Sequence, residues 1–394
     1  MRSIKLSKTG LNKLRSNQLE LKHQDFEGSI KSIPPGEWFY FEGQHPEKWI
    51  GFINPQVDEK FICAYAIEKN VEGTTANPEE IISKNLETAI RKRESVLGYE
   101  KNSRLFFGVN DGIPGLIIDQ FENAIIIQIN VAGIDKYRDF ISSFLEKRLN
   151  RKAFLLDNPR YREKEFLPIY DSPTLPDIEI QENGLRYKIR SEVLQKVGFY
   201  YDHRENRLQL MNFLERFNRT YERGLDLFSY VGAWGCSALK KNVKKVDFVD
   251  QGDFFHELSV SLESNGFYDR GIFYRQDVFK FLDEQISKKT SYDLILCDPP
   301  AFAKSASQKS QALDGYTKLH RKVFKLLGPS SLVAFSSCTH YVSHEEFQKN
   351  VLLAAQKENR KIQLLYSGMQ GFDHPVSTQS DRSNYIKSYF YIVE

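Results

Sequence analysis

The sequence predicts an α/β protein whose C-terminal half is a doubly wound, mostly parallel sheet, preceded by a small β-rich module and an α+β middle module. Three observations support this. The chain has 394 residues, more than one hydrophobic core usually supports. Short apolar runs broken by Gly, Pro and Asn dominate the first 70 residues. Beyond residue 179, short apolar strands alternate with helical segments, the pattern of a parallel sheet.

Residues 1–70 read as the β-rich module, from the runs "GEWFYFEG", "KWIGFIN" and "KFICAYAI". Residues 1–19 also carry five basic side chains and no acid. A solvated basic surface and a contact to a polyanion both explain this run, and the sequence leaves both open.

Residues 71–178 form the predicted α+β module. The segment "PEEIISKNLETAIRKRESVL" has helical spacing of its apolar side chains, namely Ile81, Ile82, Leu86, Ile90 and Val96. Two β-rich runs then flank turn signals at residues 110–112 and 114–115. A helix around 136–150 and the strand "KAFLLD" complete the module.

Residues 179–394 carry the strands of the parallel sheet: "RGLDLFSYVGAWG", "KVDFVDQGD", "IFYRQDVFKFL", "YDLILCDPP", "SSLVAFSSC" and "YIKSYFYIV". Ligands of such sheets lie outside the carboxyl ends of the strands. The glycines at 232 and 235 follow the first strand and allow close approach of the backbone to a ligand. They do not form G-x-G-x-x-G, so a ligand without a pyrophosphate fits better.

Four aspartates close successive strands of this sheet: Asp226, Asp250, Asp277 and Asp298. Singly, each could be a helix cap or a solvated loop residue. Asp250 could accept hydrogen bonds from both hydroxyls of a ribose, and Asp277 one from an adenine amino group. As an ordered set they describe a nucleoside with a cationic or zwitterionic tail, such as S-adenosylmethionine.

These motifs resemble those of class I S-adenosylmethionine-dependent methyltransferases. The stretch "LQKVGFYYDHRENR", residues 194–207, together with "DPPAFAKS" and "SSCTHYV", resembles the bacterial large-subunit (23S) ribosomal RNA cytosine-5 methyltransferases of the RlmI type. The resemblance implies a PUA-like RNA-binding domain over 1–70, an α+β domain over 71–178 and a Rossmann-like methyltransferase domain over 179–394.

The resemblance also implies roles for the 194–207 stretch. Gly198 and its neighbours would cover the cofactor, Arg204 would pair with the methionine carboxylate, and Asp202 would fix the turn between them. A local ion pair between Asp202 and Arg204 is the alternative. The implied cofactor-binding set is Gly198, Asp202, Arg204, Asp226, Phe228, Gly232, Asp250, Asp277 and Asp298.

Asp298 is followed by Pro299 and Pro300, which forbid a helix and hold the chain extended toward the ligand crevice. In amino-directed methyltransferases an aromatic residue follows such prolines at once. Here Ala301 intervenes before Phe302, which departs from that pattern.

Cys338 falls just beyond the predicted strand 331–335, beside the same crevice. On composition alone, a lone cysteine next to an apolar run is usually inert. Cytosine C5 is too weak a nucleophile to take a methyl group directly, and a thiolate adding to C6 makes C5 enamine-like. We therefore predict Cys338 as the nucleophile, with Asp298, protonated or through its hydrogen bonds, stabilising charge on N3. Cys297, inside a strand, and Cys236, inside a helix, are predicted to be structural.

The segment after Asp298 is basic, and Lys304, Lys318 and Arg321 are predicted to contact RNA phosphates. Because a base inside an A-form helix is inaccessible, the target cytosine should lie in a loop or be flipped out.

Composition excludes several other classes of protein. Net charge is only +3, and the four cysteines include no pair at zinc-ligand spacing, so we expect no metal. No apolar stretch is long enough to span a bilayer, which predicts a cytoplasmic protein without membrane contacts. A homodimer stays open. Two alternative functions also stay open: methylation of a base nitrogen in guanine or adenine, and a catalytically silent RNA-binding assembly factor.

Overall fold

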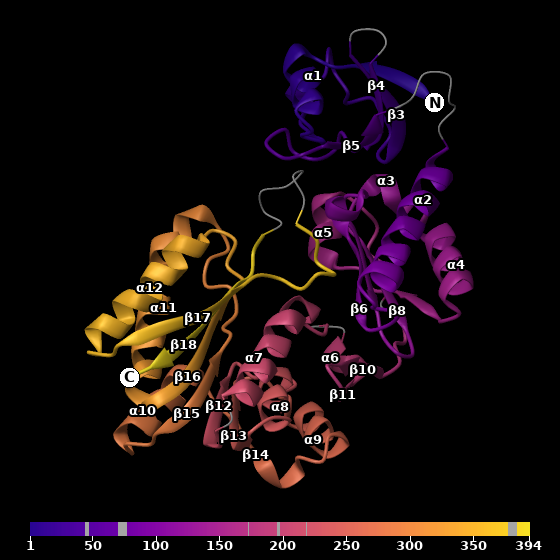
Figure 1. Cartoon of the computed structure of the whole chain (residues 1–394). Helices are drawn as coiled ribbons and strands as arrows, with labels where there is room; N and C mark the ends of the chain where they lie inside the picture. Colours follow the sequence, from indigo (N-terminus) through magenta and orange to yellow (C-terminus); the bar gives the residue numbers. More distant parts are fainter. Residues whose placement is uncertain (44–46, 70–76, 172, 195–197, 218, 377–383) are drawn as a thin grey trace. The chain divides into compact units, whose positions relative to one another are not determined.

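A computed structural model describes residues 1–43, 47–69, 77–171, 173–194, 198–217, 219–376 and 384–394 (Figure 1). Residues 195–197 of the predicted cofactor stretch lie outside this part. The chain divides into two compact units: unit 1 is Met1–Ile178 with residues 373–376, and unit 2 is Glu179–Phe372 with Asn384–Glu394. The division at 178/179 does not separate the first 70 residues from the middle module.

The first module of unit 1 is a five-stranded sheet in the order β1-β3-β4-β5-β2. Its strands are β1 (Arg2–Lys5), β2 (Glu20–Leu21), β3 (Glu37–Glu42), β4 (Lys48–Ile53) and β5 (Ala64–Lys69), with helix α1 (Lys8–Arg15) and a 3₁₀ turn (His23–Asp25). In the basic run, Lys13 pairs with Asp25 and Arg15 with Glu47, both at 2.6 Å. Acidic neighbours thus offset part of the predicted positive charge.

The middle module is a four-stranded sheet, β6-β7-β8-β9, with helices alongside. Its strands are β6 (Ser103–Phe107), β7 (Leu116–Gln120), β8 (Ile125–Ile129) and β9 (Ala153–Leu155); its helices are α2 (Pro78–Arg91), α3 (Ala132–Asp135), α4 (Arg138–Leu149) and α5 (Pro159–Lys164), with a 3₁₀ turn (Gly108–Asp111). The predicted apolar face of α2 is buried except for Val96, which is 74% exposed. Val96 turns outward because the helix widens to a π-turn over Lys92–Val96.

The two modules of unit 1 share a hydrophobic core. Trp38 and Phe52 of the first module pack in one cluster with Ile82 and Ile127 of the second. The Trp38 indole N–H also donates to the carbonyl of Gly133 at 2.9 Å. This shared core explains why the boundary predicted at residue 70 does not divide the chain into separate compact units.

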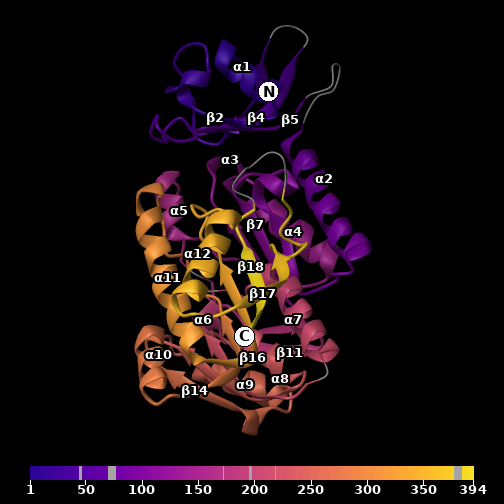
Figure 2. The same ribbon diagram turned by 60° about the vertical axis from the view of Figure 1, so that its left-hand side comes forward.

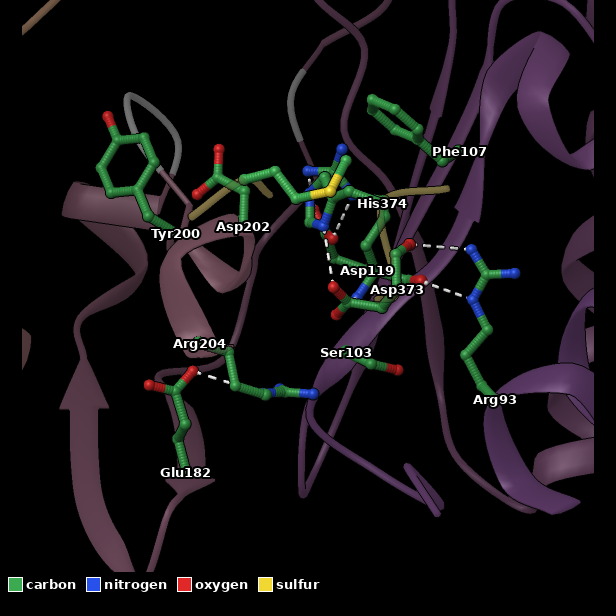
Figure 3. Close-up of polar contacts among 12 residues, drawn as sticks. Arg93, Ser103, Phe107, Asp119, Glu182, Tyr200, Asp202, Arg204, Asp373 and His374 are labelled. Atoms are coloured by element: carbon green, nitrogen blue, oxygen red, sulfur yellow. Dashed lines mark hydrogen bonds and ion pairs between the residues drawn. The ribbon is translucent and has the colours of Figure 1, made fainter. Parts of the chain in front are cut away.

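Residues 373–376 correct the predicted extent of the C-terminal domain, because they belong to unit 1. The fully buried Arg93 donates to the carboxylate of Asp111 at 2.7 and 2.6 Å. It also donates to the carbonyl of Asp373 at 2.8 Å, and both Arg93 and Asp373 are labelled in Figure 3. The Arg104 backbone N–H donates to the Asp373 carboxylate, and the His374 ring packs on Phe107. Sequence order alone gave no sign of this return to the earlier unit.

Unit 2 is built on a seven-stranded sheet in the order β14-β13-β12-β15-β16-β18-β17, in which β18 runs antiparallel to its two neighbours. The strands are β12 (Tyr221–Leu227), β13 (Val243–Asp250), β14 (Gly271–Arg275), β15 (Tyr292–Cys297), β16 (Leu327–Ser337), β17 (Ile362–Gly368) and β18 (Lys387–Val393). The sequence did not predict β17 or the hairpin of β10 (Ile178–Glu182) and β11 (Leu185–Ile189).

Helices cover both faces of this sheet, as a doubly wound fold requires (Figures 1 and 2). One group is α7 (Arg204–Arg216), α8 (Ala233–Leu239) and α9 (Phe255–Ser264); the other is α10 (Val278–Ser287), α11 (Lys309–Leu326) and α12 (His344–Lys357). The remaining short helices are α6 (Ser191–Leu194) and the 3₁₀ turns Tyr201–His203, Tyr268–Arg270 and Ala306–Gln308. In the part of the chain that the structure describes, no helix could cross a membrane.

The order of strands reverses between β12 and β15. The chain builds β12, β13 and β14 outward and then returns to β15 on the other side of β12, where Leu227 pairs with Cys297. The loops that follow β12 and β15 therefore open into one crevice at the carboxyl ends of the strands.

Candidate active site

A cavity of about 410 Å³ opens at this strand-order reversal in unit 2. Five residues predicted from the sequence line it: Asp202, Phe228, Asp250, Asp298 and Cys338. The sequence reasoning missed other residues of the lining, among them Tyr200, His203, Arg207, Tyr230 and Trp234.

The loop after β12 forms one wall and has an unusual backbone. Phe228 and Tyr230 have positive φ angles of 61° and 49°, conformations that cost non-glycine residues free energy. Asp250 holds the loop, because its carboxylate accepts hydrogen bonds from the N–H of Tyr230 at 3.0 Å and of Gly252 at 2.8 Å. At Gly232, φ is 81° and a Cβ would lie 2.4 Å from Leu258. Only glycine fits there.

Two predicted residues lie behind the cavity wall. Asp226 is 1% exposed, and its carboxylate accepts the N–H of Gly235 at 2.8 Å, which fixes the first turn of α8. Burial raises the pKa of Asp226. The carbonyl of Gly198 accepts the Tyr230 hydroxyl at 3.0 Å, which ties the 198–200 segment to the β12 loop.

Asp277 and Arg204 are outside the cavity lining. Asp277 is exposed and caps α10, accepting the Lys280 N–H at 3.0 Å. Arg204 is 5% exposed, and its Nε lies 3.4 Å from the Glu182 carboxylate (Figure 3). Their predicted contacts to adenine and to the methionine carboxylate stay predictions.

The cation in the cavity wall is Arg207, one helical turn beyond Arg204. Its guanidinium makes a bidentate pair with Glu182, at 2.6 and 2.8 Å, and donates to the carbonyl of Tyr200 at 2.8 Å. Arginines at 204 and 207 share one helix face, so the sequence could not tell which of them lines a cavity.

Asp298 lies between two partners that the sequence reasoning missed. Its carboxylate is 3.3 Å from Nε2 of His203 and accepts the Trp234 indole N–H at 3.1 Å. Burial alone would raise the pKa of Asp298, but His203 and Trp234 outweigh it and the pKa is lowered. Conversely, Asp298 outweighs burial and raises the pKa of His203. This direction favours the carboxylate form of Asp298, which would act through its hydrogen bonds.

Cys338 follows the end of β16 and is half-buried, whereas Cys236 and Cys297, which are predicted to be structural, are buried. Its neighbour Thr339 fixes it to the Asp298 loop: the Thr339 hydroxyl accepts the Phe302 N–H at 3.2 Å and bonds to the Tyr316 hydroxyl at 2.6 Å. The buried Lys387 ammonium donates to the Thr339 carbonyl at 2.7 Å. The cysteine and the aspartate are thus held on two tethered loops.

We expect the thiol of Cys338 to be protonated near neutral pH, since burial, then Asp298 and Asp202, raise its pKa to about 12. Below that pKa the thiolate fraction grows about tenfold per pH unit. Alkylation of Cys338 by iodoacetamide in the protein without added cofactor should therefore accelerate about tenfold per unit between pH 7 and pH 9. Peptide mass spectrometry measures it, with the fully buried Cys236 as the unreactive control. An alkylation rate that does not change with pH would contradict the raised pKa of the Cys338 thiol.

The predicted RNA-binding residues differ in their surroundings. Lys304 and Lys318 are exposed. Arg321 lies 2.6 Å from Glu358, and Lys309 lies 2.6 Å from Glu346. Ion pairs thus compensate part of the basic segment.

The cavity chemistry fits a cationic nucleoside. Its walls are largely aromatic and apolar, and Asp202, Asp250 and Asp298 are the carboxylates in the lining. Such a lining suits a sulfonium and an adenosine without phosphates. Among the described residues, no cluster of His, Cys, Asp or Glu could hold a metal ion.

Comparisons with known proteins agree with this chemistry. Residues 149–344 match the model of the S-adenosylmethionine-dependent methyltransferase family. Two solved structures, each 18% identical and covering all of both chains, share the fold: a proposed S-adenosylmethionine-dependent methyltransferase from Streptococcus mutans, with a TM-score of 0.76, and a proposed methyltransferase complexed with S-adenosylhomocysteine, with a TM-score of 0.77.

Curated relatives are closer in sequence. Ribosomal RNA large subunit methyltransferase I of Aeromonas salmonicida is 33% identical over 305 residues, which cover 75% of this chain and 74% of that protein. The enzyme of the same name from Yersinia pseudotuberculosis is 28% identical over 90% of this chain and 87% of that protein. The chain therefore belongs to the ribosomal RNA large subunit methyltransferase I family of S-adenosylmethionine-dependent methyltransferases.

Proposed function

We propose that this protein uses S-adenosylmethionine to form 5-methylcytosine in large-subunit (23S) ribosomal RNA through a covalent bond between Cys338 and cytosine C6. One observation carries the proposal: the half-buried thiol and the Asp298 carboxylate line the same cavity, from the ends of the adjacent strands β15 and β16. A cysteine placed there is the nucleophile that carbon methylation requires and nitrogen methylation does not.

Cys338 and Asp298 have separate roles in the proposed reaction. The sulfur of Cys338 adds to C6 while its proton passes to ring N3, which makes C5 nucleophilic. The ionised Asp298 accepts hydrogen bonds from N3–H and the 4-amino group of the adduct, and so stabilises it. S-adenosylmethionine, when bound, supplies the methyl group that C5 takes. Loss of the C5 proton then expels the sulfur, and the N3 proton returns to it.

The direct test is mass spectrometry of nucleosides. Incubation of undermodified 23S ribosomal RNA with the protein and S-adenosylmethionine should yield 5-methylcytosine at one defined site. The same nucleoside digest would reveal the competing activity, because N-methylated guanine or adenine in place of 5-methylcytosine would reject carbon methylation in favour of nitrogen methylation. Unchanged RNA would favour the silent assembly factor.

Asp250 gives a prediction for the cofactor. Replacing Asp250 by Ala should weaken S-adenosylmethionine binding by about 1 to 3 kcal/mol, because polar ligand groups in the cavity lose their partner and the β12 loop loses its anchor. Isothermal titration calorimetry measures the change. Asp253→Ala, an exposed acid three residues away, is the control and should bind like the parent. Equal affinity of the Asp250 variant would remove Asp250 from the cofactor site.

Lys318 gives a prediction for RNA. Lys318→Glu should lower the affinity for RNA. It should also reduce the steepness of a plot of log affinity against log salt concentration by about 1, because one phosphate contact is lost. Lys325→Glu is matched to it, since Lys325 lies on the same helix but 3.9 Å from Glu358. Fluorescence anisotropy at several salt concentrations measures RNA binding by the Lys318 and Lys325 variants. An unchanged slope for the Lys318 variant would remove this helix from the RNA path.

The other assignments of the site rest on resemblance. Gly198, Phe228 and Gly232 would shape the cofactor wall, Asp277 would meet the adenine amino group with the carboxylate oxygen that does not cap α10, and Arg204 would act with Arg207 toward the methionine carboxylate. Residues 1–70 would guide RNA as a PUA-like module. A flipped-out or loop cytosine is the form of substrate that a recessed thiol can reach.

A further inference from the structure

The reaction needs a base for the C5 proton, and the cavity contains one carboxylate whose position suits it. Asp202 is 9% exposed and lies in the 3₁₀ turn that leads into α7 (Figure 3). Its Oδ2 accepts the Tyr385 hydroxyl at 2.7 Å, which fixes the carboxylate plane. Its Oδ1 is buried and has no hydrogen-bond partner in the described part of the chain. A buried carboxylate oxygen left without a donor is costly unless a ligand meets it.

The other two carboxylates of the lining have contacts or roles of their own. Both oxygens of Asp250 accept backbone N–H groups at 3.0 and 2.8 Å. Asp298 contacts His203 and the Trp234 indole N–H, both through Oδ2, and the proposed mechanism uses its carboxylate to accept hydrogen bonds from N3–H and the 4-amino group. Those contacts suit fixed acceptors of hydrogen bonds. Asp202 alone among the three combines a rigid anchor on one oxygen with an unmet buried oxygen on the other.

Stereochemistry places the base on the side of the thiol. The sulfur of Cys338 occupies one face of the cytosine ring at C6, so the methyl group reaches C5 from the opposite face. The C5 hydrogen is then left on the face of the sulfur. Asp202 and Cys338 line the same cavity. They are close enough for the Asp202 charge to contribute to the raised pKa of the thiol.

We propose that Asp202 is the catalytic base that removes the C5 proton, which goes beyond its predicted part in holding the cofactor turn and rests on the proposed covalent mechanism. The Oδ1 carboxylate oxygen takes the proton from C5. The C–H electron pair forms the C5–C6 double bond, and the C6–S bond breaks. The proton on Asp202 then leaves to solvent, which accounts for the one proton released in each methyl transfer.

The decisive variant is Asp202→Asn, which keeps the shape of the side chain and an acceptor for Tyr385 but cannot take a proton. Addition and methyl transfer should proceed and elimination should stall. With cofactor labelled in its methyl group and RNA containing ordinary cytosine, a labelled protein–RNA complex that survives denaturing gels should accumulate. Release of 5-methylcytosine should fall on the order of 10²- to 10⁴-fold, the usual contribution of general base catalysis.

Three further measurements make the result decisive. The affinity of the Asp202→Asn variant for S-adenosylmethionine should stay within about threefold of the parent, because the substitution removes a proton acceptor and leaves the binding of the cofactor intact. Asp202→Glu, which retains a carboxylate, should recover part of the product release. Asp269→Asn, an exposed acid elsewhere in unit 2, should behave like the parent.

Distinct results would overturn the proposal. Product release by the Asn variant within about tenfold of the parent would show that another group takes the proton. Loss of cofactor binding, with no labelled complex, would assign Asp202 to the cofactor site alone. Failure of the parent protein to form an adduct with RNA containing 5-fluorocytosine would instead reject the covalent mechanism itself, and the assignment of Asp202 with it.

Discussion

Cys338→Ala is expected to lower the rate of methyl transfer on the order of 10³-fold or more, because the alternative cysteines of unit 2 cannot replace its thiol. Cys236 lies inside α8 and Cys297 at the end of β15, and both are fully or almost fully buried. Binding of S-adenosylmethionine should be unaffected. Methyl transfer to ribosomal RNA from labelled cofactor measures the loss, and calorimetry measures the binding.

A covalent trap tests the same residue independently. In RNA with 5-fluorocytosine at the target, addition and methyl transfer occur, but fluorine cannot leave as a proton does, so the parent protein should remain linked to RNA. Cys338→Ala should give no adduct, while Cys297→Ala should still give one. An adduct that maps to Cys297, or an Ala variant that methylates at the parent rate, would make the assignment of Cys338 wrong.

Glu182→Ala is expected to lower the free energy of unfolding of unit 2 by about 3 to 5 kcal/mol, the cost of leaving a buried charge without its partner. Glu182 is the bidentate partner of Arg207, and the two side chains are 1% and 2% exposed. The same carboxylate also lies 3.4 Å from Arg204. Burial would lower the pKa of Arg207, but Glu182 outweighs burial and raises that pKa, so the substitution removes the partner that stabilises the buried charge.

Hydrogen–deuterium exchange in urea measures this effect, because it reports peptides of unit 2 separately from those of unit 1. Cofactor affinity should fall as well, since Arg207 also holds the Tyr200 carbonyl at the cavity wall. Glu345→Ala, which breaks the exposed pair with Lys349, is the control and should change stability by less than about 1 kcal/mol. Stability of the Glu182 variant within about 1 kcal/mol of the parent would mean that water or another acid satisfies Arg207.

The fold class and the location of the site could be predicted because both follow from chain order. In parallel strands joined by helices, every strand end that precedes a helix meets the same edge of the sheet. The motifs around Phe228, Asp250, Asp298 and Cys338 therefore had to face one crevice, and the structure has them lining one cavity. The resemblance to a methyltransferase family rests on the same motifs in their order along the chain.

What the side chains contact was decided only by the tertiary structure. Asp250 ends β13, whereas Asp277 lies two residues beyond β14 and caps α10, because that helix begins directly after it. Arg207, and not Arg204, faces the cavity, because the rotation of α7 depends on its packing. The pKa of Asp298 is lowered, against the effect of burial, by His203 and Trp234, which come from other parts of the chain.

The sequence by itself determined which loops gather at the active site, because the order of strands and helices along the chain fixes the edge of the sheet at which each loop emerges. Only the tertiary structure decided the lowered pKa of Asp298, the unmet oxygen of Asp202 and the return of residues 373–376 to unit 1. Each of these features depends on hydrogen-bond donors and charged side chains that are distant in the sequence and come together only in the folded chain. In such buried contacts, a shift of one position along a helix places a different side chain against the same group.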